Sequence, residues 1–246
     1  MAIAFESGIF VSAQGALVVS AQLVTTNNIS AGVTVHTAAT GSKSVSSCVV
    51  SGLSATFAVE GLVAGTNLRC TNHYRQANTA TSTSNIRVAL NGGGGGVDIG
   101  FCVMSFTRVG STNMLRAASF STTSTVTLVL SLACGSGDMA VAFGVGPNSA
   151  TAGVAWTTFT AAEMNVAAWD LGFFYQSSSG QASIALTLVA ANAPLLGALL
   201  ILSATALGSA APSTGFVGGL ALMGCGLRIR WLIDEIIPPS LIPDAV

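Results

Sequence analysis

Hydrophobic residues recur along most of the chain in short runs that alternate in part with polar residues. The runs are rich in Val, Ile, Thr and aromatic residues, and clusters of Gly, Ser, Asn and Thr separate them. Such runs predict β-strands. The segments that show the pattern are 16–24, 31–39, 46–59, 68–76, 84–91, 99–109, 124–133, 138–146, 154–161, 169–176, 182–191 and 195–206.

The spacing of these segments indicates the fold class. No stretch before about residue 195 shows apolar residues at the helical period,. Many short strands in close succession are typical of an antiparallel sandwich or barrel, whereas a parallel sheet needs helices between its strands. We therefore expect an all-β fold, an antiparallel β-sandwich of jelly-roll-like form.

The two halves of the chain follow a similar order, which indicates an internal duplication. The stretch GSKSVSSCVVSGLSATF precedes HYRQ in the first half, and GPNSATAGVAWTTFTA precedes FYQ in the second. Phe57 and Phe159 stand at nearly equal distances before Tyr74 and Tyr175, and a Ser/Thr-rich turn follows each tyrosine. We expect repeats at 15–110 and 124–206, which form one larger sandwich or two small ones side by side.

The chain after the expected sandwich region, 1–206, has a different character. Residues 207–219 are mostly Gly, Ala and Ser and predict a linker, and residues 220–246 form a C-terminal arm. The apolar run in this region is shorter than the roughly 20 residues that a membrane span needs, so a membrane partner is not expected. We expect one short helix over 219–237, because Pro238 and Pro239 would end it. An extended arm is the alternative.

The arm combines apolar residues with charge in a chain where charge is scarce. Burying its Ile, Leu and Trp side chains against a partner would contribute several kcal/mol at about 25 cal/mol per Å². Arg and Trp are common anchors of interfaces. The preceding linker favours an arm that docks on a neighbouring subunit over one that packs on its own chain. The expected interface residues are Arg228, Arg230, Trp231, Ile233, Ile236 and Ile237.

The low charge of the whole chain limits the classes of partner. The 8 basic and 9 acidic residues amount to 7% of the 246 residues, against about 25% in an average soluble domain. The net charge of −1 and the lack of a basic cluster argue against nucleic-acid binding,. A surface of small neutral residues repels its neighbours weakly, so the composition suits a subunit of a homo-oligomer.

The N-terminal stretch bears on secretion, and the cysteines bear on metal binding and disulfides. MAIAFESGIFVSAQG has no basic region before its apolar residues, and Glu6 interrupts them, so we expect no secretory signal peptide,. The cysteines lack a CxxC pair and a histidine at ligand spacing, which argues against zinc. Buried free thiols are the expected state; a Cys48–Cys70 or Cys102–Cys134 disulfide stays open.

The motifs that suggest catalysis are weak. NGGGGGVD at 91–98 lacks the pattern of a phosphate-binding loop and predicts a turn between two strands,. The two histidines, His36 and His73, have no nucleophile motif beside them. Glu60 with Asp98, or Asp138 with Asp170, would form a carboxylate pair of the glycosidase type, but isolated surface carboxylates are expected instead. We expect no catalytic residue, no metal, no cofactor and no enzyme activity.

Five aromatic residues in the second half have two interpretations. Trp156, Trp169, Phe173, Phe174 and Tyr175 would form a sugar-stacking platform if they were exposed. Strand alternation sends Trp169, Phe173 and Tyr175 to one face and Phe174 to the other. This split favours a core cluster, and sugar binding is therefore a weak expectation.

The stretches VSSCVVSGLSATF, HYRQ, WDLGFFYQ and GQASIALTL together resemble β-sandwich domains of phage virion proteins and of bacterial surface proteins. The resemblance covers about residues 30–204. It implies a structural role and assigns no catalytic residue. We expect a virion structural protein, a capsid, decoration or fibre- or tail-associated subunit, that assembles with itself and with other virion proteins through its C-terminal arm.

Two alternatives remain open. Small residues, an apolar stretch and then Arg228 and Arg230 would suit the C-terminal sorting segment of a bacterial cell-surface protein, although 16 further residues follow Arg230. A carbohydrate-binding module would use Trp156 or Trp169 and needs a row of exposed aromatic side chains.

Overall fold

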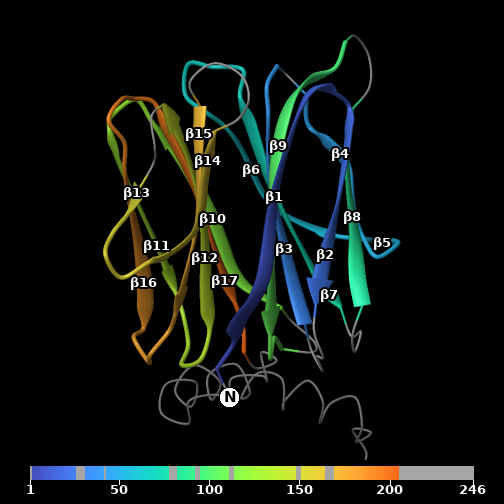
Figure 1. Ribbon diagram of the computed structural model, residues 1–246. Helices are drawn as coiled ribbons and strands as arrows, with labels where there is room; N and C mark the ends of the chain where they lie inside the picture. Colours follow the sequence, from blue (N-terminus) through green and yellow to red (C-terminus); the bar gives the residue numbers. More distant parts are fainter. Residues whose placement is uncertain are drawn as a thin grey trace, which may run out of the picture. The chain divides into compact units, whose positions relative to one another are not determined.

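The fold consists entirely of β-strands in the part of the chain that the computed structural model describes (Figure 1). That part comprises residues 2–25, 31–41, 43–77, 82–91, 95–110, 114–147, 151–163 and 169–204. The chain divides into two units, Met1–Ala206 and Leu207–Val246. The predicted linker, helix and arm therefore lie outside the described residues, and the described strands all belong to the first unit.

In the described residues, seventeen strands form four antiparallel sheets, which we name A to D. Sheets A and B use the first nine strands: β1 Ala4–Ala16, β2 Val18–Thr25, β3 Ala31–Ala39, β4 Val45–Val50, β5 Leu53–Ser54, β6 Thr56–Leu62, β7 Arg69–Ala77, β8 Ser82–Leu90 and β9 Val97–Thr107. Sheets C and D use the other eight: β10 Leu115–Thr123, β11 Thr127–Ala133, β12 Met139–Pro147, β13 Thr151–Ala152, β14 Thr157–Glu163, β15 Trp169–Ser177, β16 Ser183–Val189 and β17 Leu195–Leu202.

The predicted all-β antiparallel sandwich is confirmed, with corrections to single strands. The segment 46–59 is not one strand: it contains β4, a tight turn at Ser51–Gly52, β5 and most of β6. Both turn residues have positive φ, 50° and 79°, which suits a two-residue hairpin loop,. The pattern also missed β1 and β10 entirely.

Within the first copy, the strands pair as in a jelly roll. β1 pairs with β9, β2 with β8, β3 with β7, and β4 with β5. First strands thus meet last strands, as when a long hairpin is wrapped into two facing sheets. The second copy repeats this order with β10–β17, β11–β16 and β12–β15.

The strand orders of the sheets show the duplication directly. Sheet A runs β1-β9-β3-β7-β6, and sheet C runs β10-β17-β12-β15-β14. Sheets B and D, β2-β8-β4-β5 and β11-β16-β13, also correspond, except that the second copy shortens the third strand to two residues and has no described counterpart of β5. Each copy includes a first strand that begins before the expected repeat boundaries at 15 and 124.

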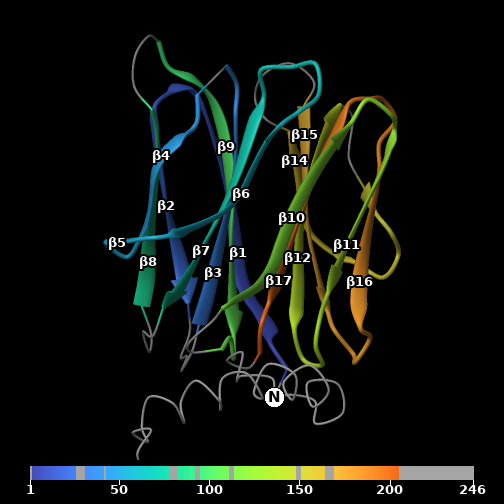
Figure 2. The same cartoon turned by 180° about the vertical axis from the view of Figure 1, so that it is seen from behind.

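The four sheets pack in the order B, A, C, D, with an apolar core between each neighbouring pair (Figure 2). Outer strands are buried on one face, so β11 and β16 alternate between buried and exposed residues. Inner strands are covered on both faces, so all eight residues of β17 are buried. This explains why the inner strands read as continuous apolar runs and the outer ones alternate.

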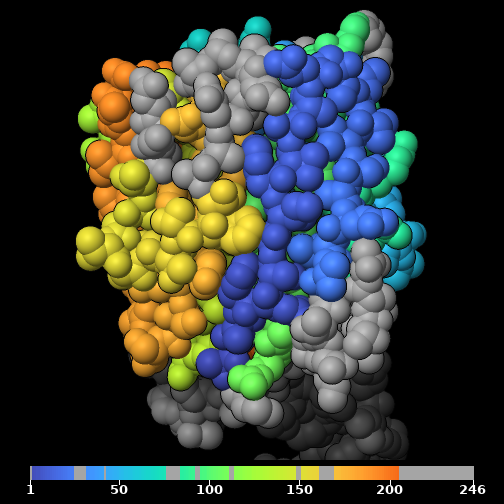
Figure 3. Space-filling view, in the orientation of Figure 1, coloured from blue at the N-terminus to red at the C-terminus, as the bar shows by residue number. Residues whose placement is uncertain are grey.

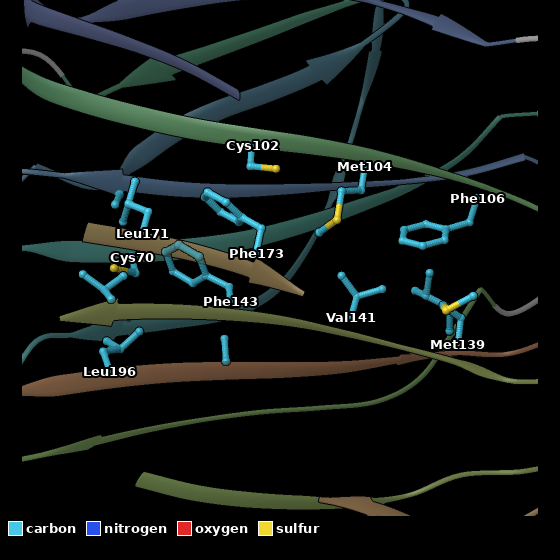
Figure 4. Close-up of a cluster of buried hydrophobic side chains, with 14 of the residues drawn as sticks. Cys70, Cys102, Met104, Phe106, Met139, Val141, Phe143, Leu171, Phe173 and Leu196 are labelled. Carbon is cyan, nitrogen blue, oxygen red and sulfur yellow. The ribbon is translucent and has the colours of Figure 1, made fainter. Parts of the chain in front are cut away.

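The core between sheets A and C joins the two copies, and we call it the shared core. Figure 4 shows Phe143 and Phe173 of sheet C in this core with Cys102 and Met104 of sheet A. At one margin β1 lies beside β14, and at the other β6 lies beside β10. In Figure 3 the blue surface of β1 accordingly adjoins the yellow surface of the second copy.

The two copies face each other as the halves of a two-fold dimer would. His36 lies between Asn72 and Cys102 in the register of sheet A, and Phe143 lies between Phe173 and Ala198 in sheet C, so the two residues correspond. Their rings stack on each other at 5.6 Å. A residue that touches its own counterpart lies on the symmetry axis, so an approximate two-fold axis passes through this contact.

Glycines at the margins of the shared core allow the sheets to approach each other. A Cβ on Gly8 in β1 would lie 2.5 Å from the ring of Phe159 in β14. A Cβ on Gly61 in β6 would lie 2.6 Å from the ring of Phe120 in β10. Each margin therefore matches a glycine of the first copy with a phenylalanine of the second.

We predict that Gly8→Val lowers the free energy of unfolding by about 1–3 kcal/mol, because the added side chain overpacks the margin against Phe159. Gly153→Val is the control, since a Cβ there meets nothing within 4 Å and should change stability little. Urea denaturation measures both. Removal of the ring in Gly8→Val/Phe159→Ala should cost less than the sum of the single changes; strict additivity would contradict the contact.

Candidate functional site

The acidic residues proposed as carboxylate pairs do not meet. Asp170 lies opposite Gly146 at one end of β12, whereas Asp138 precedes the other end, about 25 Å away at the rise of a strand,. The buried Asp138 carboxylate instead accepts hydrogen bonds from Arg116 Nε at 2.6 Å and from the Ala204 amide at 3.2 Å. Asp138 and Asp170 thus form no pair, but the expectation of an isolated surface carboxylate is wrong for Asp138, which is buried and paired with Arg116.

The second proposed pair is wrong as well. Glu60 lies on β6 and forms an ion pair with Arg69. Asp98 lies on β9, which is three strands away in sheet A, or about 14 Å at the spacing of strands,. No group of three or more His, Cys, Asp or Glu side chains suited to a metal occurs among the residues that the structure describes.

The five aromatic residues of the second copy are core residues and not a platform. Phe173 lies in the shared core with Trp169 and Tyr175 against it, and Phe174 lies between sheets C and D, so the predicted split between two faces is confirmed. Trp156 is only 8% exposed, and its indole N–H donates to the Ala185 carbonyl at 3.2 Å. The five rings therefore form no row of exposed aromatic side chains.

The indole of Trp156 replaces part of a missing strand. In the first copy the Ser51 amide donates to the carbonyl of Asn85, the counterpart of Ala185. The second copy ends its short β13 at Ala152, and the side chain of Trp156 supplies both the donor and the apolar volume.

The thiols that the structure describes are free, so neither of the disulfides left open by the sequence forms. Cys48, Cys70 and Cys102 are buried, as predicted, whereas Cys134 is only partly buried. Burial raises the pKa of the Cys48 thiol to about 12 and raises the pKa of Cys70 and Cys102. A buried neutral thiol is a poor nucleophile. Cys225 lies outside the described residues.

The glycine-rich stretch connects β8 of sheet B to β9 of sheet A, as the predicted turn requires. Of its five glycines, the structure describes Gly95 and Gly96. A Cβ on Gly96 would lie 1.8 Å from the carbonyl oxygen of Gly15, so the approach to the β1–β2 turn requires glycine there,.

The expected interface residues Arg228, Arg230, Trp231, Ile233, Ile236 and Ile237 all lie outside the described residues. Their role stays a prediction. The described part of the chain instead shows unusual chemistry in the first copy, around the two histidines.

His36 is fully buried at the two-fold contact of the shared core. Its Nδ1 shares a hydrogen bond with the Asn72 side chain, and its ring stacks on Phe143. Burial lowers the pKa of His36 to about 4, although the bond to Asn72 acts in the opposite direction. The neutral ring therefore serves as one member of an aromatic stack.

A second group of polar side chains lies on the face of sheet A that is turned toward sheet B. Thr37 and Thr71 are cross-strand neighbours, and His73 follows on β7. Both hydroxyls, both ring nitrogens of His73 and Nε of Arg69 are buried without a hydrogen-bond partner in the described part of the protein. Burial also lowers the pKa of His73 to about 4. Unpaired buried polar groups are costly, so they need an explanation.

The second copy shows that the fold does not need these polar groups. Gly144 and Gly172 pair where Thr37 and Thr71 pair in the first copy. Phe174 takes the place of His73 and packs into an apolar core. Sequence reasoning missed this difference, although aligning HYRQ with FYQS would have revealed it.

Two neighbouring strands of the first copy, β5 and β6, expose large apolar side chains. Phe57 on β6 is 53% exposed and meets the ring of His73 edge-on at 5.6 Å. Leu53 on β5 is 55% exposed. Polar atoms without partners and exposed apolar side chains thus coincide where the chain passes from β5 to β7, which makes this region a candidate binding surface.

No family model, no curated protein and no solved structure matches the chain. No helix long and apolar enough to cross a membrane occurs among the described residues.

The stability of the first unit should fall between pH 6.5 and pH 4. The unfolded chain protonates His36 below about pH 6.5, whereas the folded protein resists protonation until about pH 4. The contribution of the neutral ring to the free energy of unfolding is therefore fully present above pH 6.5 and is lost as the pH falls toward 4. At 1.36 kcal/mol per pKa unit, the loss amounts to about 3 kcal/mol.

Urea denaturation at several pH values, on the wild type and on His36→Phe, measures this loss. Phenylalanine is the residue that the second copy carries at this position. The variant should lose less stability on acidification than the wild type, because it lacks the buried imidazole. It should still lose some, since carboxylates and His73 titrate in both. Equal losses would contradict the assigned burial of His36.

Proposed function

We propose that this protein is a virion structural subunit, a capsid, decoration or fibre- or tail-associated protein, that acts by packing against copies of itself and other virion proteins. The observation that carries the proposal is the tandem jelly roll. Jelly rolls build viral capsids, and they also occur in lectins and cupins.

The outer surface supports a packing role. Every residue of β11 and β16 that points away from the core is small or β-branched and uncharged, and most of them are exposed. Val129 and Val189 are 61% and 44% exposed on this face of sheet D. Flat neutral faces carry little charge repulsion and lose little hydration when another subunit covers them.

The buried Asp138 supports a role for the C-terminal chain as an attachment. Its carboxylate binds Arg116 and the amide of Ala204, and Arg116 also donates to the Ser203 hydroxyl at 3.3 Å. The end of β17 is therefore fixed to β10 and β12. The residues that come after it would leave from a rigid base, which suits an arm that holds a neighbour.

We predict that the full chain assembles and that a chain ending at Ala206 does not. The first unit has its own three cores, so the shorter chain should stay folded. Light scattering gives the mass of each, and circular dichroism checks that both contain β-structure. An assembled full chain with a folded monomeric short chain supports the proposal. A full chain that stays monomeric at 24.5 kDa contradicts it.

A further inference from the structure

We infer that residues 233–237 of a neighbouring copy dock on the first jelly roll where β5 passes into β6. We call this surface the β5–β6 corner and define it by Leu53, Phe57, Arg75 and Arg87. The inference rests on the proposed function for the existence of a neighbour, and it adds the surface that the neighbour's arm contacts.

The corner is an edge at which apolar side chains are left in solvent. Figure 2 shows β5 leading to β6 on the near side of the first jelly roll. β5 has only two residues and ends sheet B, and β6 ends sheet A. Sheet B is therefore too narrow at this edge to cover sheet A. Leu53 and Phe57 are both more than half exposed.

One guanidinium group lies at this edge, and a second lies on the outer face of sheet B, opposite to the face that carries Leu53,. Arg75 Nη1 donates to the Ser54 carbonyl at 2.8 Å. Arg87 lies in the same row of sheet B as Ser54, with Val49 between them, or about 10 Å across two strand spacings,. Neither arginine forms an ion pair with a carboxylate among the residues that the structure describes.

The second copy lacks the side chains of Phe57, Arg75 and Arg87. The strand registers place Thr158 where the first copy has Phe57, and Gln176 where it has Arg75. Thr187 corresponds to Arg87, because Leu90 and Ala190 bond equivalently at the ends of their strands. The second copy, which has no described counterpart of β5, thus forms its jelly roll with neutral polar residues at these positions, so the fold does not require Phe57, Arg75 and Arg87.

The C-terminal chain carries the complementary chemistry. Asp234 and Glu235 are the only two acidic residues that are adjacent in the sequence, and Ile233, Ile236 and Ile237 flank them. Acid opposite arginine and isoleucine opposite Leu53 and Phe57 would match the corner in charge and in apolar surface. Ala204 to Ile233 is 29 residues, which span up to about 100 Å when extended, enough to reach another subunit.

Charge reversal tests the docking site. Light scattering compares the full chain with Arg75→Glu/Arg87→Glu and with the arm variant Asp234→Arg/Glu235→Arg. Each variant should fall to the mass of a single chain, and the combination of all four changes should restore assembly because the charges are exchanged. Arg108→Glu is the control for a lost cation, since Arg108 follows β9, which lies two strands from β7 in sheet A and does not border β5 or β6.

A mixture of the corner variant and the arm variant distinguishes an arm that docks on a neighbouring chain from an arm that docks on its own chain. One chain keeps a working arm and the other keeps a working corner. Docking on a neighbour predicts that the mixture forms a complex of one chain of each kind, whereas an arm that folds back on its own chain predicts no complex.

The outcomes distinguish this inference from the function on which it rests. If removal of the arm abolishes assembly but the corner variants assemble as the wild type does, the proposed function stands and the corner is the wrong surface. If Arg108→Glu abolishes assembly as fully as the corner variant, net charge and not docking is responsible, and the inference fails. A wild type that stays monomeric overturns both.

Discussion

The contact between sheets A and C governs the rest of the structure. Two jelly rolls that bury their inner sheets against each other must make those sheets apolar on both faces, which is why β9, β12 and β17 contain almost no exposed residue. The same contact requires glycine at the margins, where Gly8 and Gly61 meet phenylalanine rings. It also determines which sheets form the surface, because only sheets B and D keep a face in contact with solvent.

The duplication provides an internal control for what the fold requires. Positions that both copies fill with apolar residues belong to the cores, whereas positions at which the copies differ are free of that constraint. His36 differs from Phe143 yet keeps a planar ring in the stack. Thr71, His73 and Arg75 differ from their counterparts without a gain in packing, and they gather at one edge of the first jelly roll. This contrast separates residues that hold the fold from residues that the fold does not require.

The sequence predicts the fold class and most strands, because the outer strands alternate and the inner ones are continuously apolar. It misses β1 and β10 for a physical reason. These strands lie at the margins of the inner sheets, where most residues are half buried on either face, so neither alternation nor an apolar run appears. The polar group around His73 was equally hidden, because strand pairing and not sequence proximity brings Thr37 to Thr71.

The central claim is that two jelly rolls form one unit through the shared core. Differential scanning calorimetry of the chain ending at Ala206 tests it most directly. A joint core predicts one transition whose calorimetric and van't Hoff enthalpies agree, because neither copy can unfold without exposing the inner sheet of the other. Two separate transitions, each with about half of the total enthalpy, would show that the copies are independent domains and would contradict the account.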